Sequence, residues 1–86
     1  MKNYEKELKK LIFEELKTQN LKCGQVWVFS KINEFVHNLL QKYYIIAEET
    51  LRKMVNEDYF KSTESKYEYT SNLVLTEKCE KEIYNI

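Results

Sequence analysis

The stretch IAEETLRKM (residues 46–54), with the DYF that follows it at residues 58–60, decides the fold. Over residues 47–55, apolar residues recur at steps of three and four, the spacing of one buried helical face. They are Ala47, Leu51, Met54 and Val55. This spacing predicts a helix over residues 47–57. Tyr59 and Phe60 then favour extended chain, because aromatic residues are common in strands.

A second helix is expected just before this one, over residues 31–43. Its apolar residues share one face and give the strongest periodic signal in the chain. They are Phe29, Ile32, Phe35, Val36, Leu39, Leu40 and Tyr43. Ser30 is expected to cap this helix, because its hydroxyl can accept a hydrogen bond from a free amide of the first turn. Residues 44–46 interrupt the pattern and are interpreted as the turn between the two helices.

The outer parts of the chain supply the remaining elements. Apolar spacing predicts a first helix over residues 3–20, and the β-branched and aromatic residues 25–29 favour a short strand. Whether residues 25–29 form a strand or extend the second helix stays open. Downstream, two strands are expected on either side of a polar loop at 61–66, the second ending at 73–75. Thr76 is expected to cap a last short helix.

The predicted order is therefore helix, short strand, helix, turn, helix, β-hairpin, helix. No linker divides the 86 residues, so one α+β domain over residues 1–86 is expected. A winged helix-turn-helix fold fits this order, with a three-helix core, a two-stranded β-hairpin wing and a short C-terminal helix.

Two stretches resemble the winged helix-turn-helix superfamily of small microbial transcription regulators. Residues 46–60 are similar to the recognition helix of those proteins, which starts after a small polar turn, continues with Thr-Leu and ends in an aromatic residue. Residues 75–78 are similar to the Leu-Thr-x-x-Gly signature that closes the wing, although Cys79 replaces its glycine. Asp58 also stands where a glycine is usual, so Asp58 or Asn56 must form the left-handed cap there.

The resemblance implies a DNA-binding transcription regulator. The helix at about 47–57 would enter the major groove, and residues 59–75 would form the wing. Arginine pairs well with guanine and asparagine with adenine, while lysine and tyrosine suit the backbone phosphates. The residues expected to contact double-stranded DNA are Arg52, Lys53, Asn56, Lys61, Lys66 and Tyr67.

Composition keeps an alternative function open, a winged-helix protein–protein interaction module that binds no nucleic acid. The 14 lysines and arginines balance 14 aspartates and glutamates, whereas DNA-binding domains are usually basic. Glu48 and Glu49 place two carboxylates at the start of the presumed recognition helix, where they would repel phosphate. Aromatic residues make up 14% of the chain, more than so small a core needs, and they are enriched at interfaces.

A homodimer is compatible with both functions, because terminal helices commonly pair the subunits of winged-helix regulators. The candidate dimer interface is formed by Tyr4, Leu8, Leu11, Phe13, Ile83 and Tyr84. The same residues could instead complete the core of a monomer, and the sequence leaves both roles open.

No catalytic residue, metal site or cofactor is expected. His37 is the one histidine, the two cysteines lack metal-ligand spacing, and a single glycine excludes a glycine-rich phosphate loop. The adjacent carboxylates on the helices point about 100° apart and cannot act on one atom together. The sequence shows no membrane-spanning apolar run and no secretory signal, so a cytoplasmic location is expected.

Overall fold

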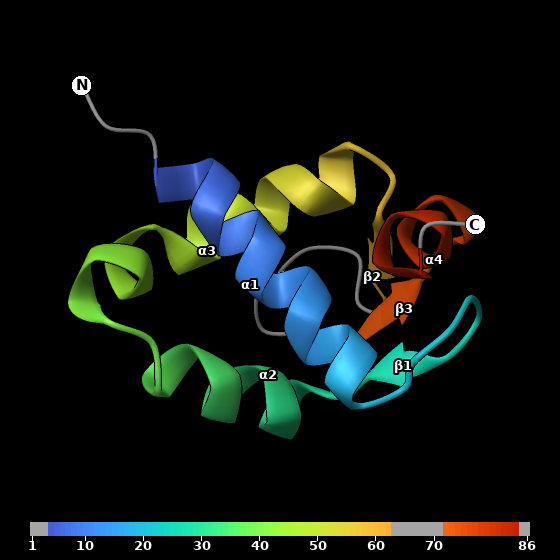
Figure 1. The fold of residues 1–86 in the computed structure, drawn as a ribbon, viewed down its shortest axis with the longest axis horizontal. Helices are drawn as coiled ribbons and strands as arrows, with labels where there is room; N and C mark the ends of the chain where they lie inside the picture. Colours follow the sequence, from blue (N-terminus) through green and yellow to red (C-terminus); the bar gives the residue numbers. More distant parts are fainter. Residues whose placement is uncertain (1–3, 63–71, 85–86) are drawn as a thin grey trace.

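The computed structural model describes residues 4–62 and 72–84, and it shows an α+β fold (Figure 1). Four helices and three strands lie within these residues. In chain order they are α1 (Tyr4–Thr18), β1 (Val26–Trp27), α2 (Phe29–His37), α3 (Gln41–Asn56), β2 (Phe60–Ser62), β3 (Leu73–Leu75) and α4 (Glu77–Tyr84). The predicted α+β class and the predicted order of elements are confirmed.

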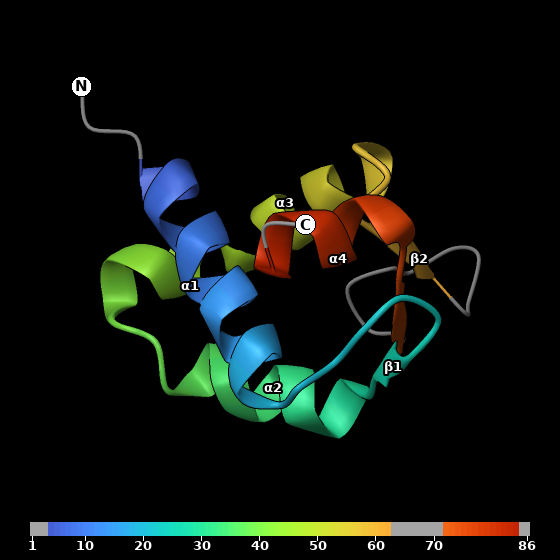
Figure 2. The ribbon, with the colours of Figure 1, turned by 45° about the vertical axis from the view of Figure 1, so that its right-hand side comes forward.

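The three strands form one antiparallel sheet in the order β1-β3-β2. Trp27 of β1 lies opposite Leu73, and Lys61 of β2 lies opposite Val74. Figure 2 shows this sheet at one side of the helices. Part of the 25–29 stretch is therefore a strand, which settles the question that the sequence left open. That strand is short, because α2 already begins at Phe29.

The boundary between α2 and α3 differs from the prediction. The expected turn at 44–46 is wrong, since α3 begins at Gln41 and continues through these residues. The chain turns at 38–40 instead, where Leu40 has extended backbone angles and its carbonyl accepts the amides of Tyr43 and Tyr44. The apolar spacing does not stop at this turn, so the sequence pattern carried the second helix too far.

The expected cap of α2 by Ser30 is also wrong. Val28 is the residue that precedes the helix, and its side chain makes no capping hydrogen bond. The amide of Phe29 donates instead to Oδ1 of Asn72, at 2.6 Å. A residue 43 positions away therefore supplies the acceptor, and the local sequence gives no sign of it. By contrast, the predicted cap of α4 is confirmed, because the Cys79 amide donates to Oγ1 of Thr76 at 3.2 Å.

The helix α3 ends in a Schellman motif that positions β2. The amide of Tyr59 donates to the carbonyl of Met54, and the amide of Asp58 donates to that of Val55. This arrangement requires a left-handed residue, and Asp58 has a φ of 73°. Of the two residues expected for this cap, Asp58 therefore forms it.

One hydrophobic core joins the helices to the sheet. α1 packs against α3 and α4, and Trp27 lies fully buried beside the rings of Phe35 and Phe60. The buried apolar residues are Leu8, Ile12, Leu16, Trp27, Ile32, Val36, Ala47, Leu51, Met54, Phe60, Leu73, Leu75, Cys79 and Ile83. Since α3 contributes only one face to this core, its opposite face is exposed to solvent.

Over the described parts of the chain, every helix is too short or too polar to traverse a lipid bilayer.

Candidate nucleic-acid interface

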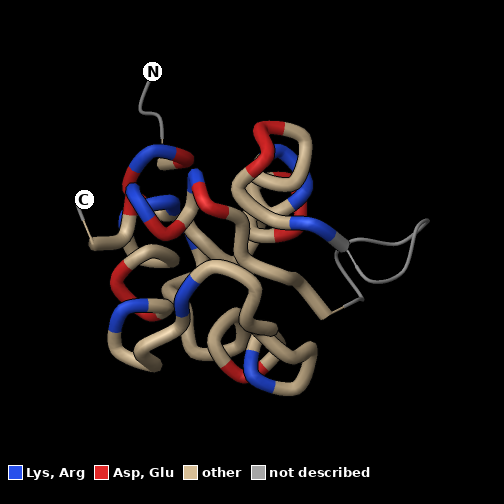
Figure 3. Tube along the Cα trace, turned by 90° about the vertical axis from the view of Figure 1, so that its right-hand side faces the viewer, with Lys and Arg blue, Asp and Glu red and all other residues tan. Residues whose placement is uncertain are grey.

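The exposed face of α3 carries three of the residues predicted to contact DNA. Arg52, Lys53 and Asn56 are all exposed, as the helical period predicted. The same face carries Glu48 and Glu49 one turn earlier. Figure 3 shows acidic and basic residues interspersed on this side of the molecule. The structure therefore brings the predicted helix residues together, but it places carboxylates beside them.

Arg52 is held by a carboxylate of its own helix. Its Nη2 donates to Oε2 of Glu48 at 2.8 Å, and both side chains are about half exposed. An exposed pair at this spacing contributes only about 0.3–0.5 kcal/mol. The pair with Glu48 by itself therefore adds little to the cost of moving Arg52 to another acceptor.

The side chain of Lys53 extends toward α1 and does not point directly into solvent from α3. Its Nζ donates to Oε1 of Glu5 at 2.9 Å, and this hydrogen bond raises the pKa of Lys53 above its ordinary value. Glu5 also lies 3.6 Å from Lys9, which in turn donates to Glu57 at 2.8 Å. Lys53 is thus part of a network between α1 and α3, a role that the sequence did not reveal.

The predicted wing falls partly within the described residues. Lys61 lies exposed on β2, next to the central strand β3. The predicted contacts Lys66 and Tyr67 lie outside the described residues. Of the three DNA contacts predicted on the wing, the structure therefore places only Lys61.

An apolar patch at the start of α3 was missed by the sequence analysis. Leu40 is 66% exposed, Tyr44 45% and Ile45 70%. The ring of His37 lies 5.7 Å from that of Tyr44, between centroids. Tyr44 and Ile45 were interpreted as part of a turn. Leu40 was assigned to the apolar face of the second helix, which is wrong because its side chain is exposed at the start of α3. Ile45 precedes Glu48, Glu49 and Arg52 by helical steps, and this spacing is the signal that could have placed it on the same outer face.

Comparison of the chain with models of known families, with curated proteins and with solved structures gave no match.

Two of the residues expected at a dimer interface belong to the core. Leu8 is 0% and Ile83 7% exposed, so placing these two at a dimer surface is wrong. Their burial corresponds to the other role that the sequence left open, completion of the monomer core. Leu8 has no exposed surface for a second subunit, and Ile83 keeps only a small one.

The other four predicted interface residues keep some exposed surface. Leu11 is exposed on α1, and Phe13 packs edge-on against Tyr59 at 5.4 Å. Tyr4 lies edge-on to Tyr43 at 6.0 Å. The hydroxyl of Tyr84 donates to the carbonyl of Leu21 at 2.7 Å.

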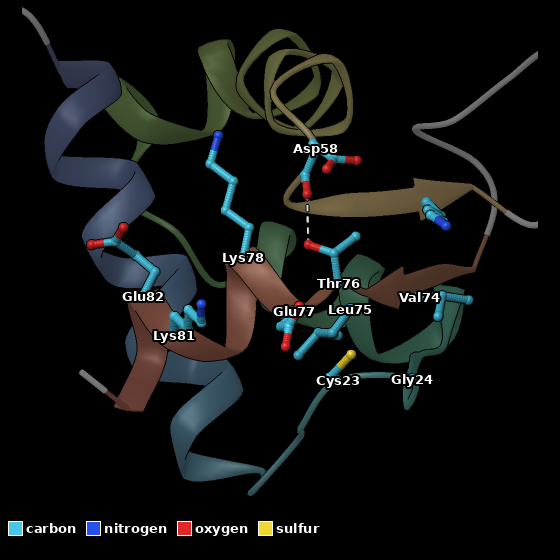
Figure 4. Close-up of a pocket in the computed structure, with 11 residues that line it drawn as sticks. Cys23, Gly24, Asp58, Val74, Leu75, Thr76, Glu77, Lys78, Lys81 and Glu82 are labelled. Atoms are coloured by element: carbon cyan, nitrogen blue, oxygen red, sulfur yellow. Dashed lines mark hydrogen bonds between the residues drawn. The ribbon is translucent and has the colours of Figure 1, made fainter. Parts of the chain in front are cut away.

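A hollow lies where α4 begins, beside the loop that leads into β1 (Figure 4). It has a volume of about 760 Å³. Its charged residues are mixed in sign: Asp58, Lys61, Glu77, Lys78, Lys81 and Glu82. The hydroxyl of Thr76 at its floor donates to the carbonyl of Asp58 at 2.6 Å. With three carboxylates opposing three lysines, the hollow has no dominant charge that would select an anion or a cation.

The described residues contain no group of three histidine, cysteine or carboxylate side chains that could hold a metal ion. Cys79 is buried, and burial raises the pKa of its thiol to about 12. Cys23 is exposed. Neither thiol therefore has ligands placed around it in the part of the chain that is described.

Proposed function

We propose that the chain is a small DNA-binding regulator of the winged helix-turn-helix kind. α3 is its recognition helix, and the β2–β3 hairpin is its wing. The observation that supports this most strongly is the arrangement of α2, α3 and the hairpin: α3 packs by one face and presents the other to solvent, directly before an antiparallel pair of strands. Helix-turn-helix proteins place such a helix in the major groove.

The exposed face supplies groups suited to base edges. Arg52 would leave Glu48 and pair with guanine, and Asn56 would pair with adenine. Ile45 lies nearer the start of the helix, where an apolar side chain can contact a thymine methyl group. Lys61 at the base of the wing would contact phosphate.

The test is fluorescence anisotropy of the whole chain with a labelled mixed-sequence duplex at low and moderate salt. We expect binding that weakens as salt rises, with each neutralised phosphate adding about 0.9 to the slope of log affinity against log salt. Arg52→Ala should weaken binding to this duplex, and Lys61→Ala should reduce the slope by about 1.

The matched control is Lys10→Ala, an exposed lysine on α1. It removes the same charge as Lys61→Ala, and the salt slope should not change. Absent or salt-independent binding at low salt would overturn the proposal. If binding occurs but Arg52→Ala leaves it unchanged, α3 does not read the DNA.

The apolar patch of Leu40, Tyr44 and Ile45 favours a second candidate function, protein–protein interaction without nucleic acid. Exposed apolar patches on small domains commonly mark docking sites, and Glu48 next to the patch would repel DNA. A chain that binds no duplex at low salt, and whose sedimentation shows self-association that Ile45→Glu abolishes, would support this candidate instead.

A further inference from the structure

A groove of about 830 Å³ runs between α1 and α4, away from the proposed DNA-reading face of α3. Its apolar floor is formed by Phe13, Tyr59 and Ile83. Phe13 is only half-buried although it packs edge-on against Tyr59. The groove therefore offers an aromatic surface that the chain itself does not cover completely.

Lysines follow one edge of this groove along α1. At 100° per residue, Lys6, Lys10 and Lys17 fall within about 40° of one another around the helix, with Phe13 beside them. All three lysines are exposed, and no described residue forms an ion pair with them. Lys6 and Lys10 are four residues apart, a spacing at which like charges repel by a few tenths of a kcal/mol, about 0.2–0.5.

The charge of the groove is positive overall. Lys9 also lines it but is already paired with Glu57 and Glu5. Glu14 and Glu82 are its two carboxylates. Three unpaired lysines therefore outnumber two glutamates around an aromatic floor. This separates the groove from the hollow beside Thr76, where the charges balance.

We propose that this groove binds an acidic amphipathic segment of a partner protein. Apolar side chains of that segment cover Phe13, and its carboxylates pair with Lys6, Lys10 and Lys17. Amphipathic helices bind apolar grooves in this way, and opposite charges around the rim steer the encounter and select the partner. The chain would thus bind an acidic partner protein through α1 and, if the proposed function holds, DNA through α3.

A second copy of the chain fits this groove less well. A two-fold interface brings the same patch of both subunits together, so the lysine row of α1 would face an identical row. DNA would supply the negative charge, but its phosphate backbone offers no extended apolar surface to cover Phe13. An acidic amphipathic polypeptide satisfies both the charge and the aromatic floor.

The probe is a fluorescent synthetic helical peptide with Leu and Phe along one face and Glu on its flanks, and its control has Lys in place of every Glu. We expect the acidic peptide to bind the whole chain with salt-dependent affinity and the basic peptide not to bind. Lys6→Glu with Lys10→Glu should weaken acidic-peptide binding at least about tenfold. Both positions are exposed, so neither new glutamate buries a charge, and position 6 lies in the first turn of α1, where negative charge is favourable.

The matched control replaces two exposed lysines elsewhere, Lys22→Glu with Lys31→Glu, and makes the same change in net charge. This variant should keep the peptide affinity. Amide shifts induced by the peptide should fall on α1 and α4.

Three outcomes would overturn the proposal. The first is no acidic-peptide binding at low salt, or binding that the two double variants weaken equally. The second is a dimer in sedimentation that Lys6→Glu with Lys10→Glu dissociates, which would make the occupant a second copy. The third is loss of duplex affinity in that variant with no peptide binding, which would assign the lysines to DNA. Duplex affinity that is absent in every variant would instead count against the proposed function of α3.

Discussion

Cys23 and Cys79 show how position in the fold changes the chemistry of one residue type. Cys23 lies exposed in the loop before β1, whereas Cys79 is completely buried on the inner face of α4. Burial disfavours the charged thiolate, and it raises the pKa of Cys79 to about 12. Because the thiolate is the reactive form, the two cysteines should differ strongly in reactivity.

We predict that one thiol per folded chain reacts with a disulfide reagent at mildly alkaline pH, and that the second reacts only in denaturant. Absorbance of the released thiol measures both phases. Cys23→Ser should remove the fast phase and leave the slow one. Equal rates for both thiols in the native protein would contradict the burial of Cys79.

At the scale of elements, Thr76 connects the start of α4 to the turn after α3. Its hydroxyl donates to the carbonyl of Asp58 at 2.6 Å and accepts the amide of Cys79 at 3.2 Å. Its own amide donates to the carbonyl of Tyr59. One side chain therefore caps a helix and also holds the Schellman turn that leads into β2.

We predict that Thr76→Val lowers the free energy of unfolding by about 1–3 kcal/mol, because it leaves a cap and a partly buried carbonyl without their partner. Thr76→Ser keeps the hydroxyl and should cost much less. Urea unfolding followed by the fluorescence of Trp27, the one tryptophan and fully buried, measures both. Equal losses in the two variants would contradict the claim that the hydroxyl is the main source of this stabilisation.

At the scale of the whole molecule, α1 and α3 are joined across 48 residues of sequence by ion pairs. Lys53 donates to Glu5, and Lys9 donates to Glu57. The hydrogen bond from Lys53 is the main cause that lowers the pKa of Glu5 below its ordinary value of 4.5. A carboxyl group whose pKa is lower in the folded than in the unfolded chain stabilises the fold at pH values above the unfolded pKa. This stabilisation is lost as the pH falls through the pKa of the folded chain.

We predict that Glu5→Gln lowers the free energy of unfolding at neutral pH by about 0.2–1 kcal/mol, the range for partly exposed pairs. The difference from the unaltered chain should shrink once the pH falls below 4.5 and vanish in stronger acid, where Glu5 is protonated in both states. Urea unfolding at a series of pH values measures this. A difference that persists unchanged in strong acid would mean that the Glu5 carboxylate does not act through its charge.

Much of the fold could be predicted from local sequence because helical spacing and caps act over a few residues. The helices, the strand near residues 26–27 and the cap at Thr76 all follow from such patterns. The end of α2 did not, because the apolar spacing continues through Leu39 and Leu40 although the backbone turns there. Apolar spacing alone does not show which of these side chains become buried when the rest of the protein packs against the helix.

The candidate DNA-contacting face was only partly predictable for the same reason. The helical period placed Arg52 and Asn56 outside, and the structure agrees. It did not place Ile45 outside, because that residue had been assigned to a turn.

The sequence by itself determined the order of the elements and which face of each helix points toward the core, because both depend on spacing along the chain. Only the tertiary structure decided that Lys53 reaches Glu5, that Leu8 and Ile83 lie in the core, and that Phe13 stays half-open beside a row of lysines. Those features join residues far apart in sequence, and they exist only once α1 has packed against α3 and α4.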